Sequence, residues 1–165
     1  MGTEHDEFLR ATMGCMDLVY NLARRMVLSP EDAQDLVQET YLAALRAYPR
    51  FDGANPRAWL LTIARNKALD AIRADARRPG ALPDPDAIPS GQPAVDDPAG
   101  GEVWESVAGL PPKQREAVLL RFAADLRYRE IGLTMDCSEA AARRSVHEGI
   151  TKLRESSETE KETRR

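Results

Sequence analysis

The side chains best suited to bind a ligand lie close together in the middle of the first half of the chain. Trp59 is followed by the run Arg65-Asn66-Lys67, and Arg73 and Arg77 continue the basic segment. An aromatic face can stack on an unstacked base, while amide and guanidinium donors can grip a nucleic-acid backbone. These residues therefore suggest a nucleic-acid surface; the plain alternative is an amphipathic core helix with a solvated polar face.

One helix must position these residues, and the sequence predicts it from Pro56 to Arg78. Proline suits the first turn of a helix, and Pro79 would end it. An apolar stripe at helical spacing predicts a face packed on a core. The stripe consists of Leu60, Leu61, Ala64, Ala68, Ala71 and Ile72.

Two further helices are expected before this one. The first runs from about Glu7 to Val27, and the second, with Ser29 as its N-cap, runs to about Tyr48. Proline, glycine and aspartate then dominate residues 79–101, a composition typical of a linker. The sequence thus predicts an all-α protein with two small domains, residues 1–78 and 102–155, a linker that lets them sit far apart, and a frayed polar tail over 156–165.

The second domain carries a helix-turn-helix pattern. A short helix around 126–135 precedes a turn and the N-cap Ser138, and the following helix buries Ala142, Val146 and Leu153. Its opposite side carries residues able to contact phosphates and base edges. These are Arg143, Arg144, His147 and Thr151, with Ala140 and Glu148. Many helical hairpins look similar, so the pattern alone leaves other roles open.

Charge is unevenly distributed along the chain. The formal net charge is −4, which by itself argues against nucleic acid, yet residues 49–78 hold seven Lys and Arg against three Asp and Glu. The segments on both sides are acidic, and the exposed side of the second helix shows Asp32, Asp35, Gln38 and Glu39. A basic segment between acidic ones fits a nucleic-acid patch flanked by surfaces for another partner.

The composition gives little support for an enzyme. His5 and His147 are the two histidines, and no catalytic or metal-ligand spacing is found, so no catalytic residue, metal, cofactor or small-molecule substrate is expected. Cys15 and Cys137 suggest neither a disulfide framework nor a zinc site. With no signal-peptide core and no apolar run of membrane-spanning length, the chain is expected to be cytoplasmic without direct membrane insertion.

Several blocks in order resemble the extracytoplasmic-function (ECF) sigma factors, the minimal two-domain specificity subunits of bacterial RNA polymerase. The blocks in the first half are residues 32–40, Ala58-Trp59-Leu60 and Ile63-Ala64-Arg65-Asn66. In the second half they include Leu110-Pro111, Gln114-Arg115-Glu116, Tyr128-Arg129-Glu130-Ile131 and Ser138-Glu139. The resemblance spans nearly everything from Phe8 to Arg154.

This resemblance implies a role for each surface. The helix carrying Asp32, Asp35, Gln38 and Glu39 would dock on the clamp of the largest polymerase subunit. The second domain would sit on the flap of the β subunit, with Ser138, Arg143, Arg144, His147 and Thr151 at the −35 promoter element. The −10 element would be melted and read by Phe51, Asp52, Asn55, Trp59, Arg65, Asn66, Lys67, Arg73 and Arg77. The resemblance also implies an anti-sigma factor as a partner.

The second domain departs from the family pattern at its recognition helix. Ser145 and Glu148 stand where basic residues are usual, while Arg144 partly restores the charge. Weak or unusual −35 binding is therefore expected. Two alternatives remain: a stand-alone helix-turn-helix regulator, and a degenerate sigma-like protein that binds DNA or polymerase without initiating transcription.

Overall fold

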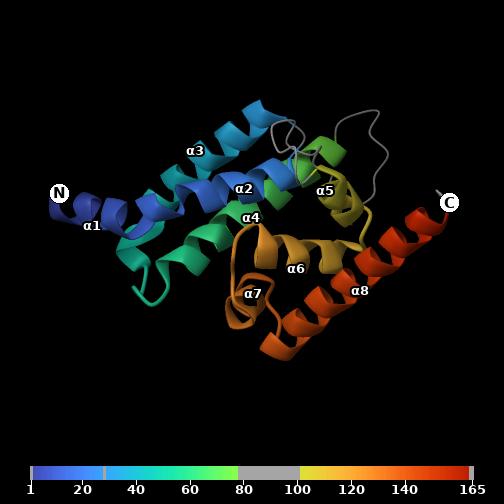
Figure 1. Cartoon of the computed structure of the whole chain (residues 1–165). Coiled ribbons are helices and arrows are strands. Elements are labelled where there is room, and N and C mark those ends of the chain that lie inside the picture. Colours follow the sequence, from blue (N-terminus) through green and yellow to red (C-terminus); the bar gives the residue numbers. More distant parts are fainter. Residues whose placement is uncertain (1, 28, 78–100, 164–165) are drawn as a thin grey trace.

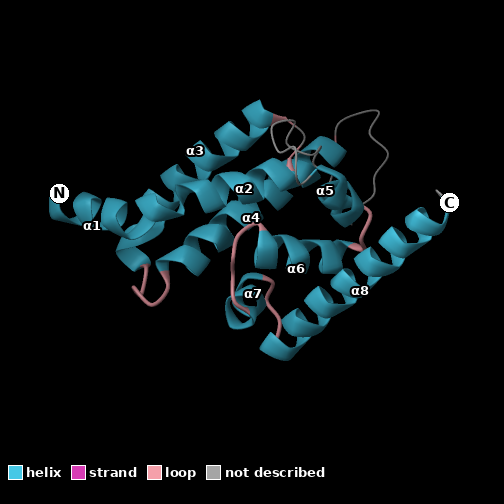
Figure 2. Ribbon diagram, viewed as in Figure 1, coloured by secondary structure: helices cyan, strands magenta, loops and turns pink. Residues whose placement is uncertain are grey.

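The computed structural model describes residues 2–27, 29–77 and 101–163. These residues form α-helices joined by short loops, with no strand in the described ranges (Figure 2). The predicted all-α class is thereby confirmed. Of the predicted linker over 79–101, residues 79–100 lie outside the described residues, and Gly101 begins α5 (Gly101–Ala108). No helix in the described ranges is long and apolar enough to cross a membrane.

The first domain packs α4 (Pro56–Ala76) against α2 (Met16–Met26) and α3 (Pro30–Ala47), with α1 (Gly2–Thr12) at one end (Figure 1). The side chains of Val19, Leu22, Met26, Leu60 and Leu61 are almost completely buried between them. The predicted apolar stripe therefore faces the core along most of α4. Its last members differ, because Ala71 is exposed and Ile72 is half-buried.

The N-terminal helix begins earlier than predicted and is interrupted. A 3₁₀ turn, η1 (Met13–Cys15), separates α1 from α2. Gly14 lies in this turn, and glycine weakens a helix interior because of its backbone freedom. Met13 and Met16, at this interruption, are exposed.

The second domain contains α5 (Gly101–Ala108), α6 (Pro112–Phe122), α7 (Tyr128–Thr134) and α8 (Glu139–Thr163). Helix α8 packs on α6 and α7 through Ala142 and Val146, which are fully buried. The C-terminal end of α8 projects from the body, on the side opposite to the start of α1 (Figure 1).

The prediction of a frayed tail after residue 155 is wrong for residues 156–163, which continue α8. No glycine or proline interrupts this stretch. The hydroxyls of Ser156, Thr159 and Thr163 donate to the carbonyl oxygens four residues earlier, at 2.9–3.0 Å. Side-chain bonds of this kind are compatible with a continuous helix.

The two domains lie against each other in this structure. Helix α7 packs beside α4, and α6 touches α2. The sequence suggested instead that the linker lets the domains sit far apart. Two hydrogen bonds that join them, Arg65–Glu116 and Asn55–Glu130, link residues 51 and 75 positions apart, which no local pattern reveals.

Candidate nucleic-acid interface

An aromatic cluster forms where the η2 turn (Tyr48–Arg50) leads into α4. The rings of Phe51 and Trp59 stack with centroids 4.5 Å apart, and Tyr48 lies 6.0 Å from Phe51. Phe51 and Trp59 are each half-buried, so part of each ring remains accessible. Stacked rings hold one another in place and present a fixed apolar surface at the start of α4.

The loop between η2 and α4 is held by its own polar groups. The carboxylate of Asp52 accepts a hydrogen bond from the Ala54 backbone N–H at 3.0 Å, and Gly53 has φ 77°, a conformation that favours glycine. Asn55 caps α4 because its Oδ1 accepts from the Ala58 N–H at 3.0 Å. The cap leaves the amide Nδ2 of Asn55 free to bind elsewhere.

The predicted basic residues of α4 do not form one patch. Arg65 and Lys67 lie two positions apart, so at 3.6 residues per turn they point to nearly opposite sides of the helix. Arg65 turns toward the second domain and pairs with Glu116. Arg73 instead pairs with Asp70 at 3.6 Å on the same exposed face as Asn66. Arg77 is exposed at the end of α4.

The helix-turn-helix of the second domain depends on one close approach. A Cβ added to Gly132 would lie 2.8 Å from the backbone oxygen of Cys137, so the turn after α7 requires a glycine there. Ser138 caps α8, as predicted, by accepting from the Ala141 N–H at 3.1 Å. The start of α8 is therefore fixed against α7.

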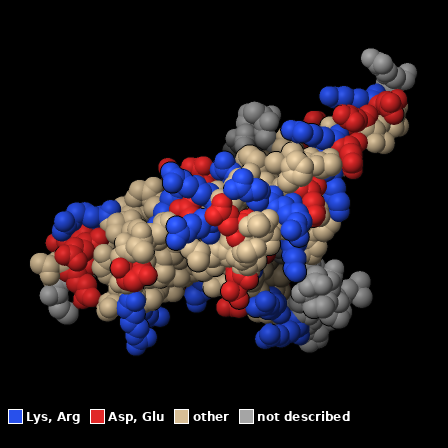
Figure 3. All heavy atoms as spheres, turned by 90° about the horizontal axis from the view of Figure 1, so that it is seen from below, with Lys and Arg blue, Asp and Glu red and all other residues tan. Residues whose placement is uncertain are grey.

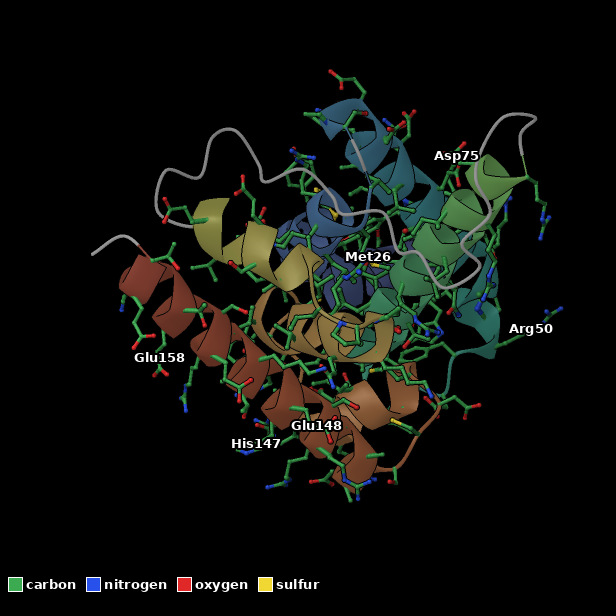
Figure 4. All side chains as sticks on the ribbon, turned by 90° about the vertical axis from the view of Figure 1, so that its right-hand side faces the viewer. Met26, Arg50, Asp75, His147, Glu148 and Glu158 are labelled. Carbon is green, nitrogen blue, oxygen red and sulfur yellow. The ribbon has the colours of Figure 1, made fainter. Side chains whose placement is uncertain are left out.

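The predicted recognition residues differ in how far they are already engaged. Arg143 pairs with Glu139 at 3.0 Å and lies over the ring of Tyr128 at 4.7 Å. Arg144 is exposed, with no ion pair or hydrogen bond to any residue that the structure describes. His147 points away from the body of the protein (Figure 4). Of the two arginines, Arg144 is the one ready to bind phosphate.

Two further polar groups of α8 are fixed by neighbours. Thr151 donates to the backbone oxygen of His147 at 3.0 Å. The carboxylate of Glu148, a residue expected to repel phosphate, accepts from Gln114 of α6 at 3.0 Å. This bond holds Glu148 on the flank of α8 that faces α6. Its charge remains near the recognition face, since the side chain is exposed.

The acidic face of α3 borders a hollow of about 210 Å³ between α3 and the end of α4. Asp32, Asp35 and Glu39 line it, and Asp75 of α4 adds a fourth carboxylate that the sequence reading missed. The floor is apolar, formed by Val27, Leu36, Ala71 and Ile72. Gln38 is exposed but does not line this hollow. An apolar floor with an acidic rim suits a basic, amphipathic segment of a protein partner.

On one face of the protein, the charges are closely mixed rather than separated by domain (Figure 3). Seen from below, basic and acidic side chains lie next to one another near the centre of the molecule and along the projecting end of α8 (Figure 3). Within the described ranges, no group of three or more His, Cys, Asp or Glu side chains is placed to hold a metal ion.

Comparison with known proteins identifies both halves. The family described as Sigma-70 region 2 matches residues 14–78, and Sigma-70, region 4 matches residues 101–153. The sigma factor CarQ of Myxococcus xanthus is 34% identical, with 83% of this chain and 81% of CarQ covered. The ECF sigma factor SigE of Mycolicibacterium smegmatis is 35% identical over 84% of this chain, which spans 57% of the length of SigE.

The fold is also similar to that of a solved sigma factor. RpoE from Bartonella quintana, in complex with the anti-sigma factor NepR, gives a TM-score of 0.74 at 24% identity, covering 90% of this chain and 95% of RpoE. The matched region 2 leaves no support for a stand-alone helix-turn-helix regulator. The chain belongs to the sigma-70 family, as an ECF RNA polymerase sigma factor, a class of transcription initiation factors rather than enzymes.

Proposed function

We propose that this chain directs promoter-specific transcription initiation and uses a separate surface for each of three contacts: the polymerase, the −10 strand and the −35 element. The hollow beside α3 docks on the clamp of the largest polymerase subunit. The aromatic cluster and the α4 residues from Asn55 to Arg77 capture the unwound −10 strand, and the exposed side of α8 contacts the −35 element. The second domain rests on the β-subunit flap, and an anti-sigma factor, like that seen with RpoE, controls access to these surfaces.

The acidic hollow is the observation that best supports this assignment. Four carboxylates around an apolar floor repel DNA, so this surface suits a protein. The aromatic rings and exposed cations lie elsewhere, at the start of α4 and on α8. A sigma factor must hold a protein and DNA at the same time, and separate surfaces allow this.

Run-off transcription with core polymerase, combined with mapping of the start sites, tests the proposed function. We expect transcripts from a set of promoters that share −10 and −35 sequences. If the protein binds core polymerase and yet produces no transcript across a genomic promoter library, the degenerate sigma-like alternative is correct instead.

The docking surface is tested by charge reversal. Asp35→Lys combined with Glu39→Lys places two cations on the rim of the hollow, and we expect core polymerase no longer to co-purify. Both side chains are exposed, so circular dichroism is expected to show an intact fold. The matched control, Glu4→Lys with Glu7→Lys on α1, makes the same charge change away from the hollow. Loss of binding in the control, or retention in the test variant, contradicts clamp docking by this face.

A further inference from the structure

The first helix of the chain meets the rest of the first domain through two buried side chains. Within α1, Phe8 and Thr12 are buried, while the residues from Gly2 to Glu7 are exposed. Helix α1 and the loop before α4 lie at the same end of the first domain (Figure 1). The match to Sigma-70 region 2 begins at residue 14, so α1 lies outside it. The contribution of α1 is therefore visible only in its own contacts.

The ring of Phe8 contacts the aromatic cluster directly. Phe8 is 2% exposed, and its ring centroid lies 5.3 Å from that of Tyr48, with the ring planes at 74°. This edge-to-face arrangement is one that aromatic pairs prefer. The ring of Tyr48 in turn lies 6.0 Å from that of Phe51 and 6.3 Å from that of Trp59. A continuous series of rings thus leads from the buried side of α1 to the two half-buried rings at the start of α4.

Two hydroxyl groups fix the position of α1 beside these rings. The phenol of Tyr41 on α3 donates to the backbone oxygen of Thr12 at 2.9 Å, and the Thr12 hydroxyl donates to the backbone oxygen of Phe8 at 2.8 Å. The ring of Tyr41 also lies 6.3 Å from that of Phe8. Burial raises the pKa of Tyr41 to about 12, so the phenol keeps its proton and remains a donor at neutral pH.

The loop that carries Phe51 is shaped by bonds that span only a few residues. The Phe51 backbone N–H donates to the Tyr48 backbone oxygen at 2.9 Å, and the Asp52 carboxylate accepts from the Ala54 N–H at 3.0 Å. Such bonds determine the course of the loop but not how its ring lies on the domain. The ring contacts with Tyr48, and behind it with Phe8, determine that.

A base that stacks on an aromatic side chain binds best when the ring is already held in place. A side chain that must be immobilised on binding costs affinity, and a preorganised one avoids this cost. Phe51 and Trp59 are half-buried, and they stack on one another. The orientation of their accessible parts therefore depends on the rings beneath them.

We propose that Phe8 is a positioning residue for reading of the −10 strand. Through Tyr48 it holds Phe51 and Trp59 in the arrangement that captures an unstacked base. Phe8 itself is too deeply buried to touch DNA. This role rests on the proposed capture of the −10 strand by the aromatic cluster.

A cycle that combines a change in the protein with a change in the DNA tests this role. The full chain in complex with core polymerase is bound to a premelted promoter, identified by start-site mapping, whose non-template −10 strand is unpaired. Each base of that strand is replaced in turn by an abasic nucleotide, and the affinity is measured. We expect the most sensitive position to cost the wild type about tenfold in affinity, as for a lost stacking contact.

Phe8→Leu removes the ring but keeps an apolar side chain in the core. We expect this variant to bind the intact strand about fivefold more weakly. At the sensitive position it should then lose only about twofold more, because the base no longer meets a fixed surface. A variant that is merely less stable would show the full abasic cost, since independent losses multiply. An equal abasic cost in Phe8→Leu and wild type overturns the proposal.

Variants of Tyr48 and Leu22 serve as the second test and the controls. Tyr48→Leu breaks the series of rings, so we expect the same reduced abasic cost, and this keeps the test valid if Phe8→Leu does not fold. Tyr48→Phe keeps the ring and should behave as the wild type. Leu22→Val shortens a fully buried side chain of α2, leaves every ring unchanged and should show the full abasic cost. A full cost in Tyr48→Leu, or a reduced one in Leu22→Val, contradicts the proposal.

The fluorescence of Trp59 reports the arrangement of the rings without DNA. Trp59 and Trp104 are the two tryptophans of the chain, so Trp104→Phe leaves Trp59 as the single reporter. In this background we expect Phe8→Leu to lower the fluorescence anisotropy of Trp59, because the ring gains rotational freedom on the nanosecond timescale. Leu22→Val should leave the anisotropy unchanged. If Phe8→Leu also leaves it unchanged, Phe8 does not position Trp59.

Failure of this role and failure of the proposed function give different results. Transcription by the wild type, with an abasic cost that Phe8→Leu does not alter, removes only the role of Phe8. Absence of any wild-type transcript removes the initiation function. The role of Phe8 in reading DNA then falls with it, even where Phe8→Leu lowers the anisotropy of Trp59.

Discussion

Two adjacent arginines at the start of α8 differ in how far their guanidinium groups are already engaged by other side chains. Arg143 is held by Glu139 and by the ring of Tyr128, while Arg144 is exposed and free of such contacts in the described structure. A cation that gives up a partner to bind phosphate gains less than one that is free. Sequence alone gave both residues the same role, because their partners depend on how α7 and α8 pack.

Salt titration of binding to a mapped −35 duplex distinguishes the two arginines. We expect Arg144→Ala to lower the slope of log affinity against log salt by about 1, the value for one lost phosphate contact. Arg143→Ala should change the slope less, because its charge is already paired with Glu139. A larger slope change for Arg143→Ala would show that its pairing is broken on DNA.

At the scale of single elements, the starts of α3, α4 and α8 were readable from the sequence because their signals are local. Ser29, Asn55 and Ser138 each cap a helix through a backbone N–H three residues ahead. Ser29 and Ser138 were predicted as caps from the sequence. The continuation of α8 to Thr163 was not predicted. Its polar composition resembled a frayed tail, and composition alone does not show the series of side-chain bonds that runs along it.

The turn between α7 and α8 gives a prediction about stability. Gly132→Ala brings a Cβ within 2.8 Å of the Cys137 backbone oxygen, so the turn must shift, at a cost of about 1–3 kcal/mol in unfolding free energy. Gly14→Ala is the matched control, since nothing lies within 4 Å of its added Cβ. Denaturant unfolding measures both. Equal stability of the two variants would mean that the turn relaxes without cost.

For the molecule as a whole, Glu130 links domain contact to pH. Burial raises the pKa of its carboxyl, but hydrogen bonds from the Arg127 backbone and Asn55, with the charges of Arg57 and Arg127, bring the pKa below its usual 4.5. The charged form is thus favoured by folding. Its stabilisation is complete above about pH 5 and is lost as the pH falls through the folded-state pKa.

Unfolding free energies from neutral to acidic pH test this link. We expect Glu130→Gln to be less stable than the wild type near pH 7, and the difference to shrink as the pH falls. Asn55→Ser keeps a capping oxygen for α4 but removes the amide that donates to Glu130. We therefore expect the difference in unfolding free energy between Asn55→Ser and wild type to shrink in the same direction as the pH falls, but by a smaller amount. A stability difference between Glu130→Gln and wild type that does not vary with pH would show that the carboxylate has no such role.

The arrangement of the whole molecule was the least predictable from sequence. Helical periodicity, caps and charge distribution gave the two helical halves and most of their cores, since each depends on neighbours within a few residues. The pairs Asn55–Glu130 and Arg65–Glu116 join positions 75 and 51 residues apart. The sequence assigned Asn55 and Arg65 to DNA, while Glu116 and Glu130 look like ordinary polar residues of their helices. The meeting of these pairs therefore emerges only in three dimensions.

The covalent connection between the domains determines how strong their contact needs to be. Residues 78–100 join the end of α4 to the start of α5, so the second domain is never far from its binding face. Short tethers of this kind give effective concentrations on the order of millimolar. At such an effective concentration, a contact with a dissociation constant of about a millimolar, negligible between separate molecules, would hold the domains together in about half of the chains. The fraction of chains with the two domains in contact can consequently be adjusted in small steps, by tether length or by a single surface charge, without any change to the surfaces proposed to read DNA.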